Sequence, residues 1–114
     1  MTFKATPREI GGATVVDLSG RITLGEGSAM LREMVRDLLN KGQNKIVLNL
    51  ADINYIDSSG IGELVSGYTT VRKQGGELKL LNLTKKVHDL LQITKLFTVF
   101  DVHTDEQAAV TSFK

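Results

Sequence analysis

The sequence predicts a small α/β domain with a mixed central sheet, an N-terminal hairpin and about four helices. Two observations lead to this fold class. Segments with strand-like and helix-like spacing of apolar residues alternate along the chain, and glycines stand between them where turns are expected. With 114 residues, 41% of them hydrophobic, and no repeat or linker, we expect one domain over residues 1–114.

The chain opens with a predicted β-hairpin. Residues 3–6 and 13–18 have the composition of strands, and the pair Gly11-Gly12 supplies the turn. Pro7 marks the outer edge of the first strand. The segment that follows predicts an amphipathic helix ending at Gly42. Its buried face is formed by apolar residues at helical spacing: Leu31, Met34, Val35, Leu38 and Leu39.

The middle of the chain predicts a strand and a second helix. Contiguous apolar residues within 45–50 are typical of a strand covered on both faces. We therefore expect this strand, extended through residues 55–56, in the middle of the sheet. The helix should open at Ser58 or Ser59 and end at Lys73, before a glycine pair. The residues expected on its buried face are Ile61, Leu64, Val65, Tyr68 and Val71.

Two further strands and two helices complete the predicted fold. Strands are expected at residues 77–81 and 99–102, with a helix between them that is capped by Thr84. Thr104 and Gln107 form a predicted capping box for a terminal helix. Because the later strands are joined through helices, they should run parallel to one another.

A polar segment from Asp57 to Gly60 follows the central strand, at the expected start of the second helix. Sites in α/β sheets gather beyond the carboxyl ends of strands, and the free N–H groups of a helix start favour an anion. The helix would tolerate a phosphate on Ser58, but nearly two negative charges beside Asp57 and Glu63 would repel a docked partner. Gly60 and Gly62 would leave the helix start bare for a partner's active site. The same residue types are also ordinary caps and turns, so spacing alone does not establish a switch.

Composition argues against several other functions. The chain has no cysteine, and its two histidines, His88 and His103, form no catalytic or metal-ligand pattern with the scattered carboxylates. A net charge of +1, 5% aromatic residues and a basic pair at residues 85–86 give little support for nucleic-acid binding. No apolar run is long enough to cross a bilayer. We expect a cytoplasmic binding protein that is not an enzyme and uses no cofactor, metal, membrane or nucleic-acid partner.

Three stretches of the chain carry a family resemblance: residues 46–50 (IVLNL), 53–62 (INYIDSSGIG) and 75–78 (GGEL). Further matches lie in the terminal helix and at Val87, Leu90, Leu91, Leu96 and Phe97. Over nearly its whole length the chain thus resembles the anti-sigma factor antagonists, which are built on the STAS domain. The resemblance implies a compact mixed-sheet domain with four helices and a role in partner switching.

The resemblance implies that the unmodified protein binds an anti-sigma factor and thereby releases a sigma factor. The anti-sigma factor is often a serine kinase of the histidine-kinase-like ATPase type. It would phosphorylate Ser58, the first serine of the motif, and a serine phosphatase would restore it, with Ser59 as a neighbour that can cap the helix. The expected partner-binding residues are Asp57, Ser58, Ser59, Gly60, Ile61, Gly62 and Thr23.

One position departs from the family's pattern. Family members commonly carry Gly-x-Leu-Asp at the end of the second strand, whereas here residues 20–23 read Gly-Arg-Ile-Thr, which puts Thr23 in the aspartate's place. Because Thr23 lacks the charge, the resemblance does not determine how this position contacts a kinase or its nucleotide. We expect the loop at residues 24–27 to tune partner choice. Alternatively, a STAS-like module serves as a stressosome-type scaffold or binds a small ligand, such as a nucleotide or lipid, at the same loop. The sequence names neither the sigma factor nor the oligomeric state.

Overall fold

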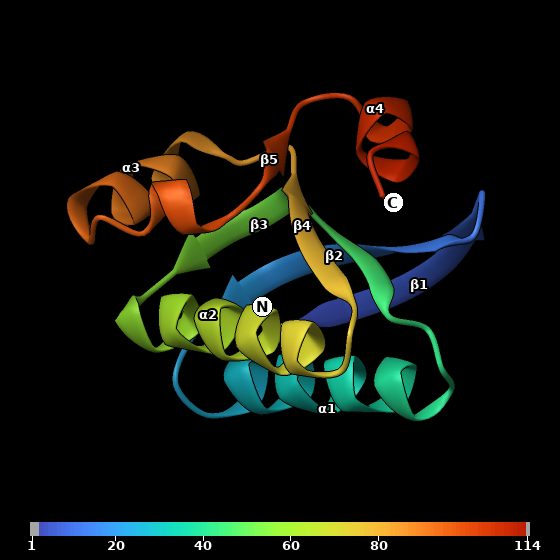
Figure 1. The fold of residues 1–114 in the computed structure, drawn as a ribbon. Helices are drawn as coiled ribbons and strands as arrows, with labels where there is room; N and C mark the ends of the chain where they lie inside the picture. The colour runs from blue at the N-terminus through green and yellow to red at the C-terminus, as the bar shows by residue number, and fades with distance from the viewer. Residues whose placement is uncertain (1–2, 114) are drawn as a thin grey trace.

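The computed structural model describes residues 3–113, which form five strands, four α-helices and one 3-10 helix (Figure 1). In chain order these are β1 Lys4–Ile10, β2 Ala13–Ile22, α1 Glu26–Asn40, β3 Lys45–Ile56, α2 Ser58–Lys73, β4 Glu77–Leu81, α3 Lys85–Ile93, η1 Phe97–Val99, β5 Val102–His103 and α4 Glu106–Thr111. The strands form one sheet in the order β1-β2-β3-β4-β5, with β1 antiparallel to β2 and the other neighbours parallel. The predicted mixed sheet, its N-terminal hairpin and the central position of β3 are confirmed.

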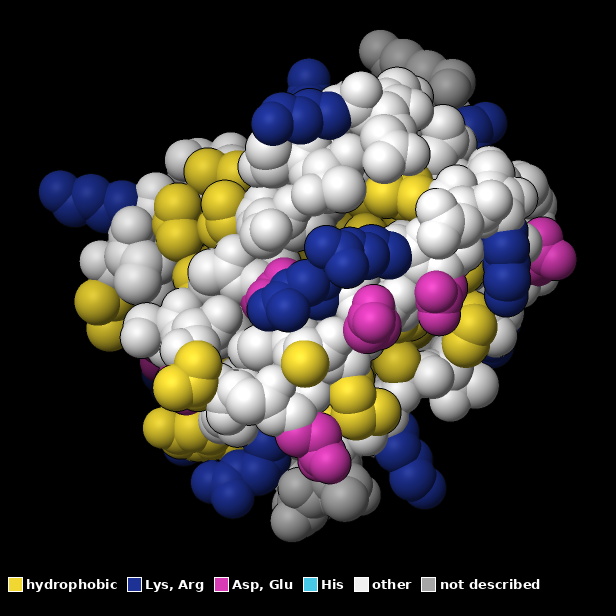
Figure 2. Space-filling view, turned by 90° about the horizontal axis from the view of Figure 1, so that it is seen from below, with side chains coloured by type: hydrophobic (Ala, Val, Ile, Leu, Met, Phe, Trp, Pro, Cys, Tyr) yellow, Lys and Arg dark blue, Asp and Glu magenta, His cyan; other side chains and the backbone are white. Residues whose placement is uncertain are grey.

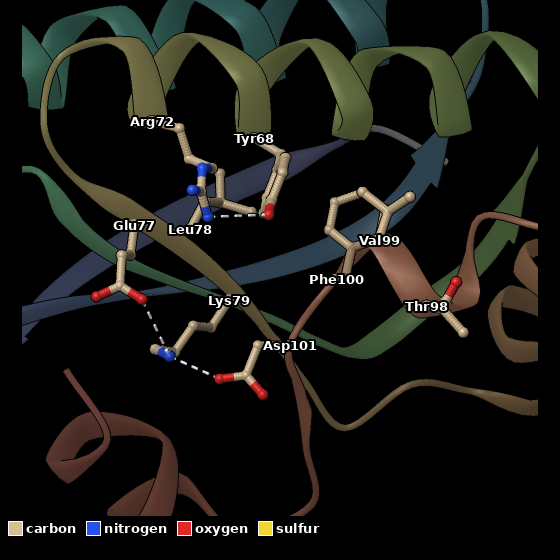
Figure 3. Close-up of a pocket in the computed structure, with 9 residues that line it drawn as sticks. All are labelled: Tyr68, Arg72, Glu77, Leu78, Lys79, Thr98, Val99, Phe100 and Asp101. Atoms are coloured by element: carbon tan, nitrogen blue, oxygen red, sulfur yellow. Dashed lines mark hydrogen bonds and ion pairs between the residues drawn. The ribbon is translucent and has the colours of Figure 1, made fainter.

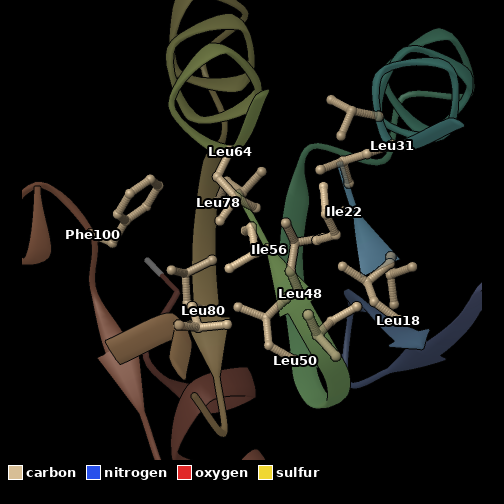
Figure 4. Packing of buried hydrophobic residues seen from close by; sticks show 14 of the residues in the cluster. Leu18, Ile22, Leu31, Leu48, Leu50, Ile56, Leu64, Leu78, Leu80 and Phe100 are labelled. Atoms are coloured by element: carbon tan, nitrogen blue, oxygen red, sulfur yellow. The ribbon is translucent and has the colours of Figure 1, made fainter. Parts of the chain in front are cut away.

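The two faces of the sheet are covered unequally. Helices α1 and α2 lie side by side against one face, whereas α4 covers part of the opposite face and α3 packs beside the far end of β3 (Figure 1). Successive strand residues point to opposite faces, so Val16 and Leu48 enter the main core, part of which is shown in Figure 4. Their neighbours Val15 and Val47 enter a smaller cluster under α4. The strand β3 is therefore covered on both faces, as its apolar run predicts.

β3 extends beyond its neighbour β4, and this extension positions the candidate site. β4 pairs with β3 only from Lys45 to Asn49, so the second half of β3 pairs with β2 alone and projects to Ile56. The predicted continuation of the strand through residues 55–56 is confirmed. The end of β3 delivers the chain directly to Asp57 and α2, at the carboxyl edge of the parallel strands.

The N-terminal elements are longer than the sequence pattern predicts. β1 runs through Pro7 to Ile10, and it pairs only with β2, so no second neighbour requires the N–H that proline lacks. Helix α1 begins at Glu26, ahead of its first apolar core residue. Its predicted end is confirmed, because Gly42 follows it with a φ of 79°, a left-handed conformation that glycine adopts readily.

The prediction of a strand at residues 99–102 is wrong. Residues Phe97–Val99 form η1 instead, and this turn places Phe100 in the main core. Only Val102–His103 remain extended, and they pair with the last two residues of β4. The apolar composition of the segment therefore reflects burial of Phe100 and not a longer ladder.

The terminal helix α4 is capped one residue later than predicted. Instead of a capping box at Thr104 and Gln107, the Asp105 carboxylate accepts a hydrogen bond from the N–H of Ala108 at 2.9 Å. A carboxylate also complements the positive end of the helix dipole, which favours Asp105 over a hydroxyl. The predicted cap of α3 is confirmed, since Thr84 Oγ1 accepts a backbone N–H at 3.3 Å.

Candidate functional site

The first turn of α2 is held by Asp57, the residue between β3 and the helix. Its Oδ1 accepts a hydrogen bond from the N–H of Gly60 at 2.9 Å, which makes Asp57 the N-cap. Ser59 is therefore not the cap. Ser58 is the first residue of the helix and is exposed, whereas Ser59 is half-buried. Of the two serines, Ser58 is thus the more accessible.

Asp57 also ties the end of β3 to the loop between β2 and α1. Its N–H donates to the carbonyl of Ile22 at 3.3 Å, and its Oδ2 accepts from the N–H of Leu24 at 3.4 Å. In the same loop, the Thr23 carbonyl accepts from the N–H of Ser28 at 3.1 Å and from its Oγ at 2.9 Å. The structure therefore brings the half-buried Thr23 and its loop beside the start of α2.

The glycines of the first turn play different parts. A side chain on Gly60 would collide with the Ile22 carbonyl and lie 2.6 Å from the Ile56 side chain, so this glycine lets α2 pack closely on the strand ends. Gly62 is exposed, and a Cβ there would meet no atom within 4 Å. The expectation of a bare helix start therefore holds at Gly62 and is wrong at Gly60. Ile61 between them is 2% exposed and belongs to the main core.

Exposed hydrophobic side chains flank this edge of the sheet. Leu24 is 79% exposed, Ile93 is 77% exposed and Tyr55 is 36% exposed, and we call these three side chains the apolar rim. Tyr55 and Ile93 line, together with Ile56 and Leu90, a cleft of about 250 Å³ between the end of β3 and α3. The rim therefore offers an apolar surface around the start of α2 that a partner can cover.

The apolar rim was not predicted as a set of site residues. Its members come from the loop after β2, the end of β3 and the last turn of α3, and only the fold brings them together. One signal was present, because Ile93 lies off the face on which α3 buries Val87 and Leu91. A single exposed apolar residue is common, however, and it marks a contact surface only when others lie near it.

Two cations lie over the ring of Tyr55. Arg21 Cζ and Lys86 Nζ are each 5.1 Å from the ring centroid, within the range of a cation–π contact. The other lysine of the basic pair, Lys85, is bound to Asp89 at 2.8 Å, and this hydrogen bond lowers the pKa of the Asp89 carboxyl. The apolar rim is therefore bordered by positive charge from both β2 and α3.

Glu63 is turned toward α1 and away from the partner surface that the sequence predicts. Its Oε1 accepts a hydrogen bond from Arg32 Nη2 at 2.9 Å, and its side chain is only 10% exposed. That bond raises the pKa of the Arg32 guanidinium. Figure 2 shows basic side chains at the centre of the face formed by α1 and α2, with acidic ones beside them. The expectation that Glu63 adds negative charge around Ser58 is wrong, because Arg32 compensates it.

Each of the two histidines contacts a neighbouring side chain. Across residues 3–113, no three His, Asp or Glu side chains are grouped so that they could hold a metal ion. The ring of His88 packs edge-on against Phe97 with centroids 4.9 Å apart, and His103 Nε2 lies 3.0 Å from Asp101 Oδ2. Within the same range, no helix has the length and hydrophobicity needed to cross a bilayer.

Comparison with known proteins gives a match over almost the whole chain. The STAS domain family model matches residues 4–109. The anti-sigma F factor antagonist of Paenibacillus polymyxa is 30% identical over 104 residues, which are 90% of this chain and 88% of that protein. The anti-sigma-B factor antagonist of Bacillus subtilis is 34% identical over 95 residues, which are 83% of this chain and 85% of that protein.

The fold is also found in solved structures. The Bacillus protein SpoIIAA, an anti-sigma factor antagonist, superimposes with a TM-score of 0.70 in its unphosphorylated form and 0.72 in its phosphorylated form. Each comparison has 19% identity and covers 96% of this chain and at least 96% of that one. With the family model matching nearly every described residue, this chain belongs to the STAS domain family, and anti-sigma factor antagonists are its relatives.

Proposed function

We propose that this chain is a cytoplasmic anti-sigma factor antagonist that works by partner switching. In its unmodified form it binds an anti-sigma factor that is also a serine kinase, and so frees a sigma factor. The kinase transfers the γ-phosphoryl group of ATP to Ser58 Oγ, which loses its proton, and ADP is the leaving group. The complex then dissociates. A serine phosphatase then hydrolyses the phosphoserine and restores the binding form.

The observation that carries this proposal is the exposed position of Ser58 next to the apolar rim. A partner that covers the rim also removes water from Ser58. A phosphate with nearly two negative charges would then have to lose its hydration against apolar surface, which is strongly unfavourable. In the free protein the same phosphate stays hydrated and lies near the positive end of the α2 dipole. Phosphorylation therefore favours the free protein over the complex.

Within the proposed interface, the predicted residues divide between contact and support. Ser58 and Gly62 are exposed and face the partner, together with the loop that holds Thr23. Asp57 and Gly60 hold the strand ends and the helix start in place through hydrogen bonds and close packing. Because Thr23 has no charge, we propose that this loop contributes mainly apolar contacts.

The relatives support both the partner and the mode of control. The two bacterial relatives are named for antagonism of anti-sigma factors, which supports an anti-sigma factor as the partner. SpoIIAA has been solved in a phosphorylated form, which supports control by phosphate.

The proposal is tested by recovering the tagged chain from its native cells and quantifying the co-purified serine kinase by mass spectrometry. Wild type and Ser58→Ala should recover similar amounts, and Ser58→Asp at least about tenfold less, because it adds negative charge at the interface. Ser66→Asp is the matched control, an exposed serine of the same helix outside the rim, and it should bind like wild type. Equal recovery with Ser58→Asp would rule out the blocking mechanism.

A scaffold or ligand-binding role makes different predictions in the same cells. Ser58 would stay unmodified under all growth and stress conditions. The chain would instead be recovered as a large homomeric assembly, or with a nucleotide or lipid bound.

A further inference from the structure

The cleft between the end of β3 and α3, which we call the rim cleft, combines apolar and cationic side chains. β3 contributes Tyr55 and Ile56 to it, and α3 contributes Leu90 and Ile93. Lys86, from the first turn of α3, lies four residues before Leu90 and seven before Ile93, so all three share one face of the helix. An ammonium group and two aliphatic side chains therefore border the same opening.

The two cations beside the rim cleft are not neutralised by the protein. Arg21 Cζ and Lys86 Nζ each lie 5.1 Å from the centroid of the Tyr55 ring, which attracts a cation without cancelling its charge. In the described part of the chain, neither cation forms a salt bridge. The carboxylate that lines the cleft, Asp89, is bound to Lys85 at 2.8 Å. The cleft therefore has an excess of positive charge.

A cleft of about 290 Å³ at the outer edge of β4 shows the opposite arrangement (Figure 3). There, Lys79 Nζ lies 2.6 Å from Asp101 Oδ2 and 3.5 Å from Glu77 Oε1. The contact with Lys79 lowers the pKa of the Asp101 carboxyl. With Arg72, the described residues that line this cleft include two cations and two carboxylates. Their charges balance, so this cleft does not select a charged partner.

The rim cleft lies close to Ser58. Tyr55 and Ile56 are the last residues of β3, and three residues of chain span at most about 11 Å. A specific interface buries about 800 Å² on each partner, which is a much wider area. A kinase that takes Ser58 into its active site therefore also covers the rim cleft.

We propose, resting on the function proposed above, that the serine kinase fills the rim cleft with an apolar side chain and places a neighbouring aspartate or glutamate against Lys86, with Arg21 beside it. Leu90 and Ile93 cover the apolar side chain. The carboxylate is needed because a partner that covers two unpaired cations with apolar surface alone would have to desolvate both. The cleft thus selects a partner with an apolar and an acidic side chain next to each other.

Charge reversal tests the acidic contact. Lys86→Glu and Arg21→Glu should each lower the recovery of the serine kinase from native cells about tenfold, because an attraction becomes a repulsion. Lys73→Glu is the matched control, since it makes the same change of charge at an exposed lysine in the last turn of α2, outside the rim cleft. It should bind like wild type. An equal loss from the control would assign the effect to net charge and overturn the proposal.

Salt separates an effect of charge from an effect of a displaced Tyr55 ring. Raising the salt from about 0.15 M to about 1 M shortens the Debye length from about 8 Å to about 3 Å. The tenfold difference between wild type and Lys86→Glu should then shrink to less than about threefold. A difference that stays the same at high salt would overturn the acidic contact.

The partner's group is identified by treating the complex with a carbodiimide. This reagent joins an ammonium group to a carboxylate in contact with it, forming an amide with loss of water. Mass spectrometry should find Lys86 joined to an aspartate or glutamate of the kinase. Lys85 and Asp89, 2.8 Å apart in this chain, are the internal positive control. A sample in which only the control pair is joined, or in which Lys86 is joined to a second copy of this chain, would overturn the proposal.

Ser58→Asp, measured in the same recovery experiment, separates this inference from the function on which it rests. Loss of the kinase with Ser58→Asp and full recovery with Lys86→Glu would overturn the acidic contact alone. Full recovery with Ser58→Asp would overturn the phosphate switch itself.

Discussion

The two ends of the sheet present different kinds of side chain at the surface. At the start of α2, the backbone is tied up by Asp57, whose N–H and carboxylate bind Ile22, Leu24 and Gly60, while apolar side chains are left exposed. At the outer edge of β4, by contrast, the charged side chains are paired with one another, since Lys79 contacts both Asp101 and Glu77. The first region therefore offers an uncovered apolar surface to a partner, whereas the second has its charges balanced within the protein.

This difference also decides which region phosphate can control. Apolar contacts lose their value when a charge is placed among them, because the charge must then be desolvated. The ion pairs at the outer edge of β4 lie at the opposite end of the sheet and are much less sensitive to one distant charge, particularly at physiological ionic strength. We therefore expect phosphorylation to govern the region around Ser58 and to leave the β4 edge unaffected.

The largest effect is expected from loosening the helix that serves both regions. Leu64, in the middle of α2, is 1% exposed, so Leu64→Ala should lower the free energy of unfolding by about 2–5 kcal/mol. Leu24→Ala, at a position that is 79% exposed, should change it by less than about 0.5 kcal/mol. Chemical denaturation followed by circular dichroism measures both. Small and equal losses would contradict a core beneath α2.

A smaller loss of stability should separate the two glycines of the first turn. Gly60→Ala forces a methyl group against the Ile22 carbonyl and should cost about 1–3 kcal/mol. Gly62→Ala has open space and should stabilise the helix by up to about 1 kcal/mol. Thermal unfolding of the two variants makes the comparison. A neutral Gly60→Ala would mean that the strand ends and α2 are not in close contact.

Substitutions in the apolar rim should affect binding and leave stability unchanged. Ile93→Ser removes a side chain that is 77% exposed, and we expect the recovery of the serine kinase from native cells to fall about tenfold. Val99→Ser is the control, because Val99 is an exposed apolar residue that lies away from the rim, in a cleft at the outer edge of β4. Its recovery of the kinase should match wild type. Equal losses from both variants would remove the distinction between the two regions.

The smallest effect is expected from an exposed ion pair beyond both regions, where α4 meets the hairpin. Arg8 binds the Asp17 carboxylate at 2.6 Å and 3.0 Å, and with a hydrogen bond from Asn49 it lowers the pKa of Asp17 below 3.8. A lowered pKa in the folded state stabilises the protein above the unfolded-state pKa, and this stability is lost as the pH falls through the lower, folded-state value. The loss should stay below about 1 kcal/mol because both side chains are 37% exposed.

This prediction is checked by measuring the free energy of unfolding from pH 6 to pH 2. Asp17→Asn should be less stable at pH 6 and approach wild type as the pH falls below about 3.8, the ordinary value for this carboxyl. A constant difference between the two proteins across this range would show that Asp17 does not titrate at a lowered pKa.

Most of the fold could be predicted because local signals and tertiary packing agree. The apolar run at residues 46–48 and the helical spacing from Ile61 to Val71 state which faces are buried, and the turns are marked by glycine. The strand predicted at residues 99–102 is wrong. In this segment the Phe100 side chain is buried in the main core, and the strand that follows has only two residues. A short alternation of apolar and polar residues cannot distinguish one buried side chain from a strand.

The candidate site could be predicted only in part, for a related reason. Ser58 lies at a strand-to-helix junction, which is visible in the sequence. The pairing of Glu63 with Arg32 is not, because these residues are 31 positions apart and meet only when α1 and α2 pack together. The same holds for Leu24 and Ile93, which the fold brings to one edge of the sheet. Contacts between distant segments therefore had to come from the structure.

The central claim is tested most directly by mapping phosphate in two fractions of a native cell extract. The extract is separated by size into free chain and chain bound to larger partners, and the peptide covering residues 54–72 is analysed by mass spectrometry in each. We predict phosphate on Ser58 in the free fraction and unmodified Ser58 in the bound fraction. Equal phosphorylation of Ser58 in both fractions, or none in either under all growth and stress conditions, would contradict it.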